Sequence, residues 1–212
     1  MKYLATFSFL MMMFVGAMAQ DKSAAELKNE GNAALKAKDY KAALELFEQA
    51  IPVWEGEMDA AMVYNAATCA YKTKANDKAL GYYAQANELG YKQDACLYYA
   101  YKINKKAGNA EEVNKNYEAA VEKYPNSKYV KAMKKEKVKP MVKEANEIYA
   151  KAQEKLNARV ADNADKWEVL KAESVALCDK AIAVCDEVLA IYPADKNAPV
   201  IKTRCEDLKK AE

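Results

Sequence analysis

Few residues in this chain could carry catalysis. The sequence contains no histidine, which excludes Ser-His-Asp and Cys-His nucleophile systems and the common imidazole zinc sites. It has no phosphate-binding loop, dinucleotide fingerprint or nucleophile elbow. Carboxylates remain, for example Asp162, Asp165, Glu168 and Glu173, but polar helix faces explain their spacing. We therefore predict no catalytic residue, no cofactor and no metal site, with a carboxylate-based hydrolase as the alternative.

The cysteines are the other reactive side chains. None of the five forms a C-x-x-C pair, so a zinc ribbon or a thioredoxin-type motif is excluded. Cys178 and Cys185 lie about 10 Å apart along one helix, too far for a disulfide. Cys185 could pair with Cys205 if the last helix folds back. The alternative is that all five, Cys69, Cys96, Cys178, Cys185 and Cys205, are small buried hydrophobes.

The N-terminus has the layout of a secretory signal peptide. Lys2 precedes an apolar run from Tyr3 to Val15, and Ala17-Met18-Ala19 is a small-x-small cleavage site. The run is shorter than the roughly 20 residues that span a bilayer. We expect residues 1–19 to be removed, leaving Gln20 first, and the protein to be exported to the periplasm, envelope or exterior. An uncleaved anchor or a first core helix is the alternative.

Composition favours helix and a near-neutral surface. Ala, Lys, Glu and Leu are abundant, and there are only 6 Gly and 5 Pro residues. The formal net charge is +2 for the whole chain and, because Lys2 is the only charge in residues 1–19, +1 afterwards. Nucleic-acid binders have a strongly basic surface, so we expect no nucleic-acid partner. No second apolar stretch is long enough to span a membrane, so we expect no stable membrane insertion.

One trio of residues recurs along the chain. It is Ala43, Phe47, Ala50, then Ala79, Tyr83, Ala86, then Val113, Tyr117, Ala120, at offsets of 36 and 34 residues. An i, i+4, i+7 trio lies on one helical face, where small residues let a second helix approach. Apolar pairs precede each trio in segments 27–31, 63–67 and 97–101, and turn-like residues separate pair from trio. Asn109 and Glu112 resemble a capping box.

This pattern resembles the tetratricopeptide repeat, a helix-turn-helix unit of 34 residues. The first unit matches best, with Gly31-Asn32, Asp39-Tyr40 and Ala50-Ile51, whereas Ala67 and Tyr101 replace the glycine in the next two units. The resemblance implies an all-α fold, a right-handed superhelix of antiparallel helical hairpins. We predict three repeats over residues 24–127.

The C-terminal part keeps the register less clearly. Ala181, Cys185, Val188 and Pro193 repeat the third unit at an offset of 68, but Glu147, Lys151 and Glu154 occupy the intervening trio. Residues 128–195 are predicted to form one enlarged hairpin or two degraded ones, with Pro140 breaking the first helix and a turn within 157–165. Residues 196–212 are predicted to form a capping helix.

The resemblance also implies a binding groove, because the first helices of such repeats line the inner surface. The groove residues it indicates are Lys28, Asn32, Leu35 and Lys36, then Tyr64, Asn65, Thr68, Tyr71 and Lys72, then Tyr98, Tyr99, Lys102, Lys105 and Lys106. The set has no carboxylate, which favours an acidic protein or peptide partner. Alternatively, the tyrosines pack internally and Lys36, Lys72 and Lys106 stabilise helix ends.

One subclass of the family grips a peptide's terminal carboxylate. Lys28, Asn32 and Asn65 match three places of that clamp, but Ala95 and Tyr99 occupy the two basic places, so the clamp is at best half present. A separate basic run from Lys131 to Lys143 indicates a solvated helix, or alternatively contact with an anionic surface.

Together these observations predict an exported scaffold that binds a protein or peptide. Self-association into a homo-oligomer is the alternative, because an exposed terminal repeat and an odd cysteine count permit it.

Overall fold

The computed structural model describes residues 22–158 and 166–210, and these residues form helices without any strand. The helices are α1 (Ala24–Lys36), α2 (Tyr40–Ala50), the short 3-10 segment η1 (Ile51–Val53), α3 (Ala60–Lys72), α4 (Asn76–Glu88), α5 (Gln93–Ala107), α6 (Ala110–Lys123), α7 (Lys128–Asn157), α8 (Trp167–Ile191) and α9 (Ala198–Lys210). The predicted signal peptide lies outside the described residues, as do Asp162 and Asp165.

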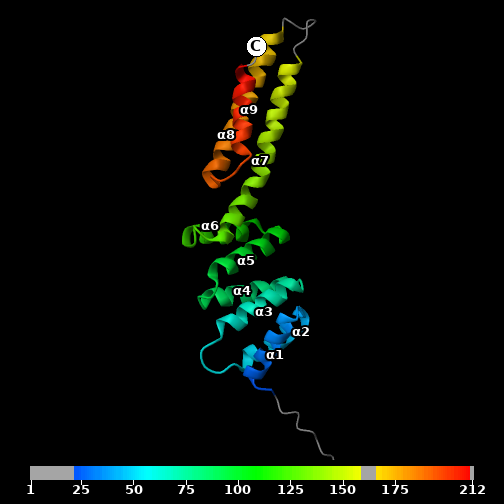
Figure 1. The fold of residues 1–212 in the computed structure, drawn as a ribbon, viewed down its shortest axis with the longest axis vertical. Helices are drawn as coiled ribbons and strands as arrows, with labels where there is room; N and C mark the ends of the chain where they lie inside the picture. Colours follow the sequence, from blue (N-terminus) through cyan, green and yellow to red (C-terminus); the bar gives the residue numbers. More distant parts are fainter. Residues whose placement is uncertain (1–21, 159–165, 211–212) are drawn as a thin grey trace, which may run out of the picture.

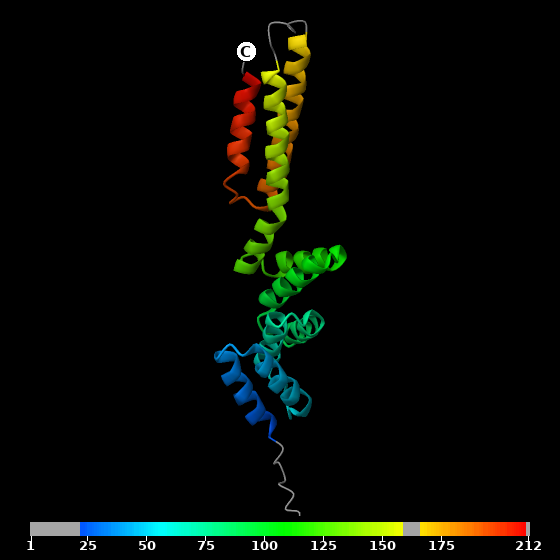
Figure 2. The same cartoon turned by 90° about the vertical axis from the view of Figure 1, so that its right-hand side faces the viewer.

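The helices stack as hairpins into an elongated solenoid (Figures 1 and 2). Helices α1 and α2, α3 and α4, and α5 and α6 pack as pairs, and each pair contacts the next. Helix α7 then leads from the repeats into a bundle in which it packs on α8 and α9. The structure confirms the predicted all-α solenoid. Among the described residues, no helix has the length and apolar character required to cross a membrane.

Local signals in the sequence set the helix ends. Ser23 and Glu26 form a capping box at the start of α1, and the side chains of Asp39 and Asp59 accept amide hydrogen bonds at the starts of α2 and α3. The expected box at Asn109 is wrong, because the side chain of Asn109 makes no capping hydrogen bond. The acidic first turn of α6, with Glu111 and Glu112, still favours a helix start there.

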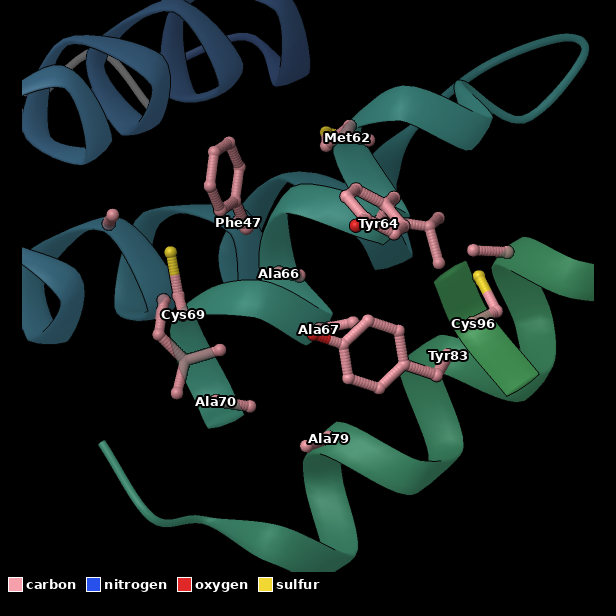
Figure 3. Packing of buried hydrophobic residues seen from close by; sticks show 14 of the residues in the cluster. Phe47, Met62, Tyr64, Ala66, Ala67, Cys69, Ala70, Ala79, Tyr83 and Cys96 are labelled. Carbon is pink, nitrogen blue, oxygen red and sulfur yellow. The ribbon is translucent and has the colours of Figure 1, made fainter. Parts of the chain in front are cut away.

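The recurring trios form the seams between helices. Ala43, Phe47 and Ala50 are fully buried, and Ala79, Tyr83 and Ala86 repeat this burial in the second unit. Figure 3 shows Phe47, Tyr64 and Tyr83 pointing into this core. A Cβ atom added at Gly31 would lie 2.7 Å from Cε1 of Phe47, so the glycine in the first repeat permits close approach of α1 and α2.

Pro140 does not break its helix, contrary to the expectation. Helix α7 runs unbroken for 30 residues with Pro140 inside it. A proline in a helix interior costs about 3 kcal/mol. Buried residues on both sides offset this cost, because Val130 and Met133 pack in the core of the third repeat while Ala145 and Ala152 pack against α8. Tertiary packing therefore outweighs the local preference.

The remaining C-terminal segment is one enlarged hairpin followed by a short helix. Helices α7 and α8 form the hairpin, and Ala181, Cys185 and Val188 are fully buried in it. The charged positions Glu147, Lys151 and Glu154 are exposed on α7. All five cysteines are buried and unpaired, as expected for small hydrophobes. Helix α9 covers α8 through Ile201 and Cys205.

Candidate functional site

Four half-buried tyrosines lie next to one another on three successive first helices. Tyr71 belongs to α3, Tyr98 and Tyr99 to α5, and Tyr129 to α7. Their ring centroids are 5.2 Å apart for Tyr71 and Tyr99, 5.3 Å for Tyr98 and Tyr99, and 5.1 Å for Tyr98 and Tyr129. Such tilted and edge-on contacts are favourable aromatic geometries. We call these four residues the tyrosine surface.

The tyrosine surface packs on the core through buried tyrosines. Tyr83 of α4 is 1% exposed and stacks on Tyr99 with a centroid distance of 5.2 Å and an interplanar angle of 9°. Tyr64 contacts Tyr83 edge-on at 5.8 Å and is itself only 8% exposed. Of the sequence-predicted groove residues, Tyr64 thus offers a partner little surface, and its main contacts are with the core.

Burial and neighbouring rings raise the pKa of three tyrosines in this region. Burial raises the pKa of Tyr99, and the nearby Tyr129 raises it further. Burial also raises the pKa of Tyr64 and Tyr83 far above the ordinary value of 10.0. Tyr99 therefore stays protonated at neutral pH, where its hydroxyl group can donate a hydrogen bond to a bound carbonyl or carboxylate.

Lys102 lies at the edge of the tyrosine surface. Its Nζ is 5.8 Å from the centroid of Tyr98 and 3.7 Å from a carboxylate oxygen of Glu136 on α7. Glu136 also forms an ion pair with Lys105, at 3.1 Å. Burial opposes the charge of Lys102, but Tyr98 and Glu136 outweigh it and raise its pKa. The structure thus adds to the predicted groove a carboxylate that the predicted set lacked.

The residues suggested for a carboxylate clamp contact other parts of the chain. Lys28 forms an ion pair with Asp59, the residue that caps α3, and its Nζ lies 5.2 Å from the Trp54 ring. Burial opposes ionisation of Asp59, but hydrogen bonds from Lys28 and the Met62 amide lower its pKa. The lysine of the clamp therefore already binds a carboxylate of its own chain.

Asn32 and Asn65 likewise pair with each other. The amide nitrogen of Asn65 lies 3.1 Å from the side-chain oxygen of Asn32. This bond joins the first helices of units one and two, and it leaves each side chain with further donor or acceptor capacity.

The three lysines at the ends of first helices do not join the tyrosine surface. Lys36, Lys72 and Lys106 are exposed in the last turns of α1, α3 and α5, where a cation interacts favourably with the helix dipole. Lys72 lies 5.9 Å from the ring of Tyr40 on α2.

The sequence did not indicate three residues that contact predicted groove residues. Tyr129, Asp59 and Glu136 each lie 31 positions after a contacted residue, namely Tyr98, Lys28 and Lys105. This shared separation is a little shorter than one repeat. Each contact joins a residue of one first helix to the N-cap residue or to a side chain of the next first helix. The residues 31 positions after the predicted groove residues Tyr98, Lys28 and Lys105 are these three.

The fold and the tyrosine surface define a helical-repeat protein of stacked hairpins. Its structure is similar to that of a TPR repeats protein from Bacteroides fragilis, with a TM-score of 0.60 and 20% identity over 88% of this chain and 98% of that chain. This likeness establishes the fold.

Two further structures resemble the chain more loosely. A putative protein binding protein from Bacteroides ovatus has a TM-score of 0.42 and 14% identity, covering 89% of this chain and 98% of that one. The TPR2AB domain of yeast Sti1, solved with pHSP90, has a TM-score of 0.45 and 18% identity, covering 87% and 83%. No family model and no curated protein matches the sequence.

Proposed function

We propose that this protein is an exported interaction module that binds a peptide or a partner protein across the tyrosine surface. The observation that carries the proposal is that Tyr71, Tyr98, Tyr99 and Tyr129 stay partly exposed on α3, α5 and α7 although each contacts another ring. Tyrosine is enriched at protein interfaces, because it combines a large apolar area with a polar group and loses little conformational entropy.

The ring contacts support binding by a prearranged surface. Tyr99 contacts Tyr71, Tyr98 and Tyr129 and stacks on the buried Tyr83. Side chains held in this way have already lost the rotamer freedom that a binding partner would otherwise have to remove. Binding in this region therefore requires little rearrangement.

Export is part of the proposal and rests on the sequence alone. The layout of residues 1–19 supports a cleaved signal peptide. Mass spectrometry of the protein isolated from its native cells tests it, since a chain beginning at Gln20 is expected and an intact Met1 in the mature protein would refute it.

The binding proposal is tested with peptides selected on the full chain from a random display library. The selected peptides are titrated into Tyr98→Ala, Tyr129→Ala and the control Tyr82→Ala, whose tyrosine is half-buried on the second helix α4. Loss of a central interface tyrosine costs more than about 1 kcal/mol, so affinity is expected to fall roughly tenfold in the first two variants only. Equal affinity in all folded variants would refute the proposal.

A further inference from the structure

A concave region lies between α7 and α9, beside the end of α5. It is a hollow of about 770 Å³ whose apolar wall is formed by Pro140, Val142, Val200 and Ile201. Val200 is 47% exposed, although it is a large aliphatic residue. The volume is in the range of pockets that hold small ligands or a few side chains.

The border of this hollow is strongly basic. Lys105, Lys139, Lys143 and Arg204 line it, against a single carboxylate of the described residues, Glu136, which leaves a net of three positive charges. Glu136 is already paired with Lys102 and Lys105. Lys143 pairs with the exposed Glu147, an interaction that contributes little in water.

Two of the cations have no such counterion in the described part of the chain. Among residues 22–158 and 166–210, neither Lys139 nor Arg204 forms an ion pair. Arg204 is one of only two arginines in the chain, and its planar guanidinium can bind a carboxylate through two parallel hydrogen bonds. The charge of the hollow therefore complements an anionic ligand that also carries apolar groups.

Backbone chemistry at the wall favours a peptide as that ligand. Pro140 has no N–H, so the carbonyl of Glu136 lacks its usual helical donor. Asn146 and Asn197 also line the hollow, and each amide side chain can both donate to and accept from a peptide group. A peptide supplies N–H donors for these acceptors, whereas a fatty acid supplies none.

The hollow is connected to the tyrosine surface. Glu136 pairs with Lys102, which lies against Tyr98, and with Lys105, which lines the hollow. Tyr129 and Pro140 lie on the same helix, about 16 Å apart along its axis. An extended peptide covers this distance with about five residues.

We propose that the hollow binds an acidic, aliphatic peptide segment of the partner protein. Carboxylates of the segment pair with Arg204 and Lys139, and its aliphatic side chains pack on Val142, Val200 and Ile201. The inference rests on the proposed function, because it names the chemistry of the partner and places its acidic part next to α9 rather than along the first two repeats.

The probe for this proposal is a fluorescent octapeptide alternating glutamate and leucine, titrated into the full chain by anisotropy. Replacing Arg204 or Lys139 removes a charge-assisted hydrogen bond, so Arg204→Gln and Lys139→Gln are each expected to weaken binding roughly tenfold. Val200→Ser is expected to weaken it about fivefold through lost apolar contact. The control Lys151→Gln changes an exposed lysine on α7 outside the hollow and is expected to bind as the wild type does.

Three results would overturn the proposal. They are no binding of the octapeptide, equal binding by folded Arg204→Gln, and displacement of the octapeptide by decanoate at lower concentration than by unlabelled peptide, which would indicate a fatty-acid site. Each claim is tested by its own variant. Equal octapeptide binding by folded Arg204→Gln overturns this inference alone, whereas equal binding of the selected peptides by folded Tyr98→Ala overturns the proposed function alone.

Discussion

Asn65 of α3 donates a side-chain hydrogen bond to Asn32 of α1, with 3.1 Å between nitrogen and oxygen. Beside this pair, Lys28 binds Asp59 and lies against Trp54. The polar residues of the first two units therefore hold neighbouring first helices together. The capture of a terminal carboxylate at this place would require Lys28 to exchange Asp59 for the ligand.

This arrangement predicts that terminal carboxylates contribute little to binding. A peptide selected on the full chain is expected to bind within about twofold whether its C-terminus is free or amidated, because Lys28 gains no new ion pair. Isothermal titration of the two forms measures the difference. A loss of tenfold or more on amidation, abolished in Lys28→Met, would contradict the assignment of Lys28 to an internal pair.

Substitution of Gly31 by alanine is expected to destabilise the protein by about 1 to 3 kcal/mol, because the new Cβ would lie 2.7 Å from the fully buried Phe47 ring. Gly81 is the matched control, since it is exposed within α4 with no atom within 4 Å of an added Cβ. Gly81→Ala is expected to stabilise by about 0.5 to 1 kcal/mol. Urea unfolding measures both changes, and the account fails if both variants shift in the same direction.

Pro140→Ala is expected to raise the free energy of unfolding by about 1 to 3 kcal/mol. The substitution restores an N–H donor in the exposed interior of α7 and removes the proline ring from the preceding turn. Thermal unfolding followed by circular dichroism measures it. An unchanged or lower midpoint would show that the proline is needed for the course of α7.

The five buried thiols are expected to be unreactive in the folded protein at pH 8. Burial raises the pKa of Cys96 and Cys205 to about 12 and that of Cys69 to about 11, from an ordinary value of 9.0. Ellman's reagent is expected to titrate all five only after denaturation. Rapid reaction of the reagent with any thiol of the native chain would show that the helix packing around that thiol opens.

The same raised pKa values predict lower stability at alkaline pH. The unfolded chain loses these protons from about pH 9, whereas the folded chain retains them until its own thiol pKa values near 11 to 12 are reached. The stabilisation is thus complete below about pH 9 and is lost as the pH rises through that window. Denaturant unfolding at pH 8 and pH 10.5 measures it, and a stability that rises with pH would be the wrong sign.

Much of the fold could be predicted because its seams are local in sequence. Small and aromatic residues recurring at Ala43, Phe47 and Ala50 define a helix face whatever the neighbouring helix is. The expectations at Pro140 and Asn109 were wrong for the opposite reason. Long-range packing of α7 keeps the helix continuous at Pro140, and the geometry of a single side chain decides whether Asn109 caps α6. Periodicity does not contain that information.

The candidate site was predictable only in part. The resemblance indicated Tyr71, Tyr98 and Tyr99, and the structure places them side by side. It could not indicate that Tyr64 would be buried by Tyr83 and Tyr91, or that α9 would lie beside α7 and form a basic hollow. The burial of Tyr64 and the position of α9 both depend on the rotation of each helical element relative to its neighbour.

The most direct test of the account is photocrosslinking in native cells with benzoylphenylalanine in place of Tyr71, Tyr98 or, as a control, Tyr82. If the tyrosine surface binds the partner, the Tyr71 and Tyr98 positions are expected to crosslink the same protein, and the α4 position is not. Crosslinks only from the α4 position, with the variants folded and equally abundant, would show that the partner binds the opposite side of the repeats and would contradict the proposed function.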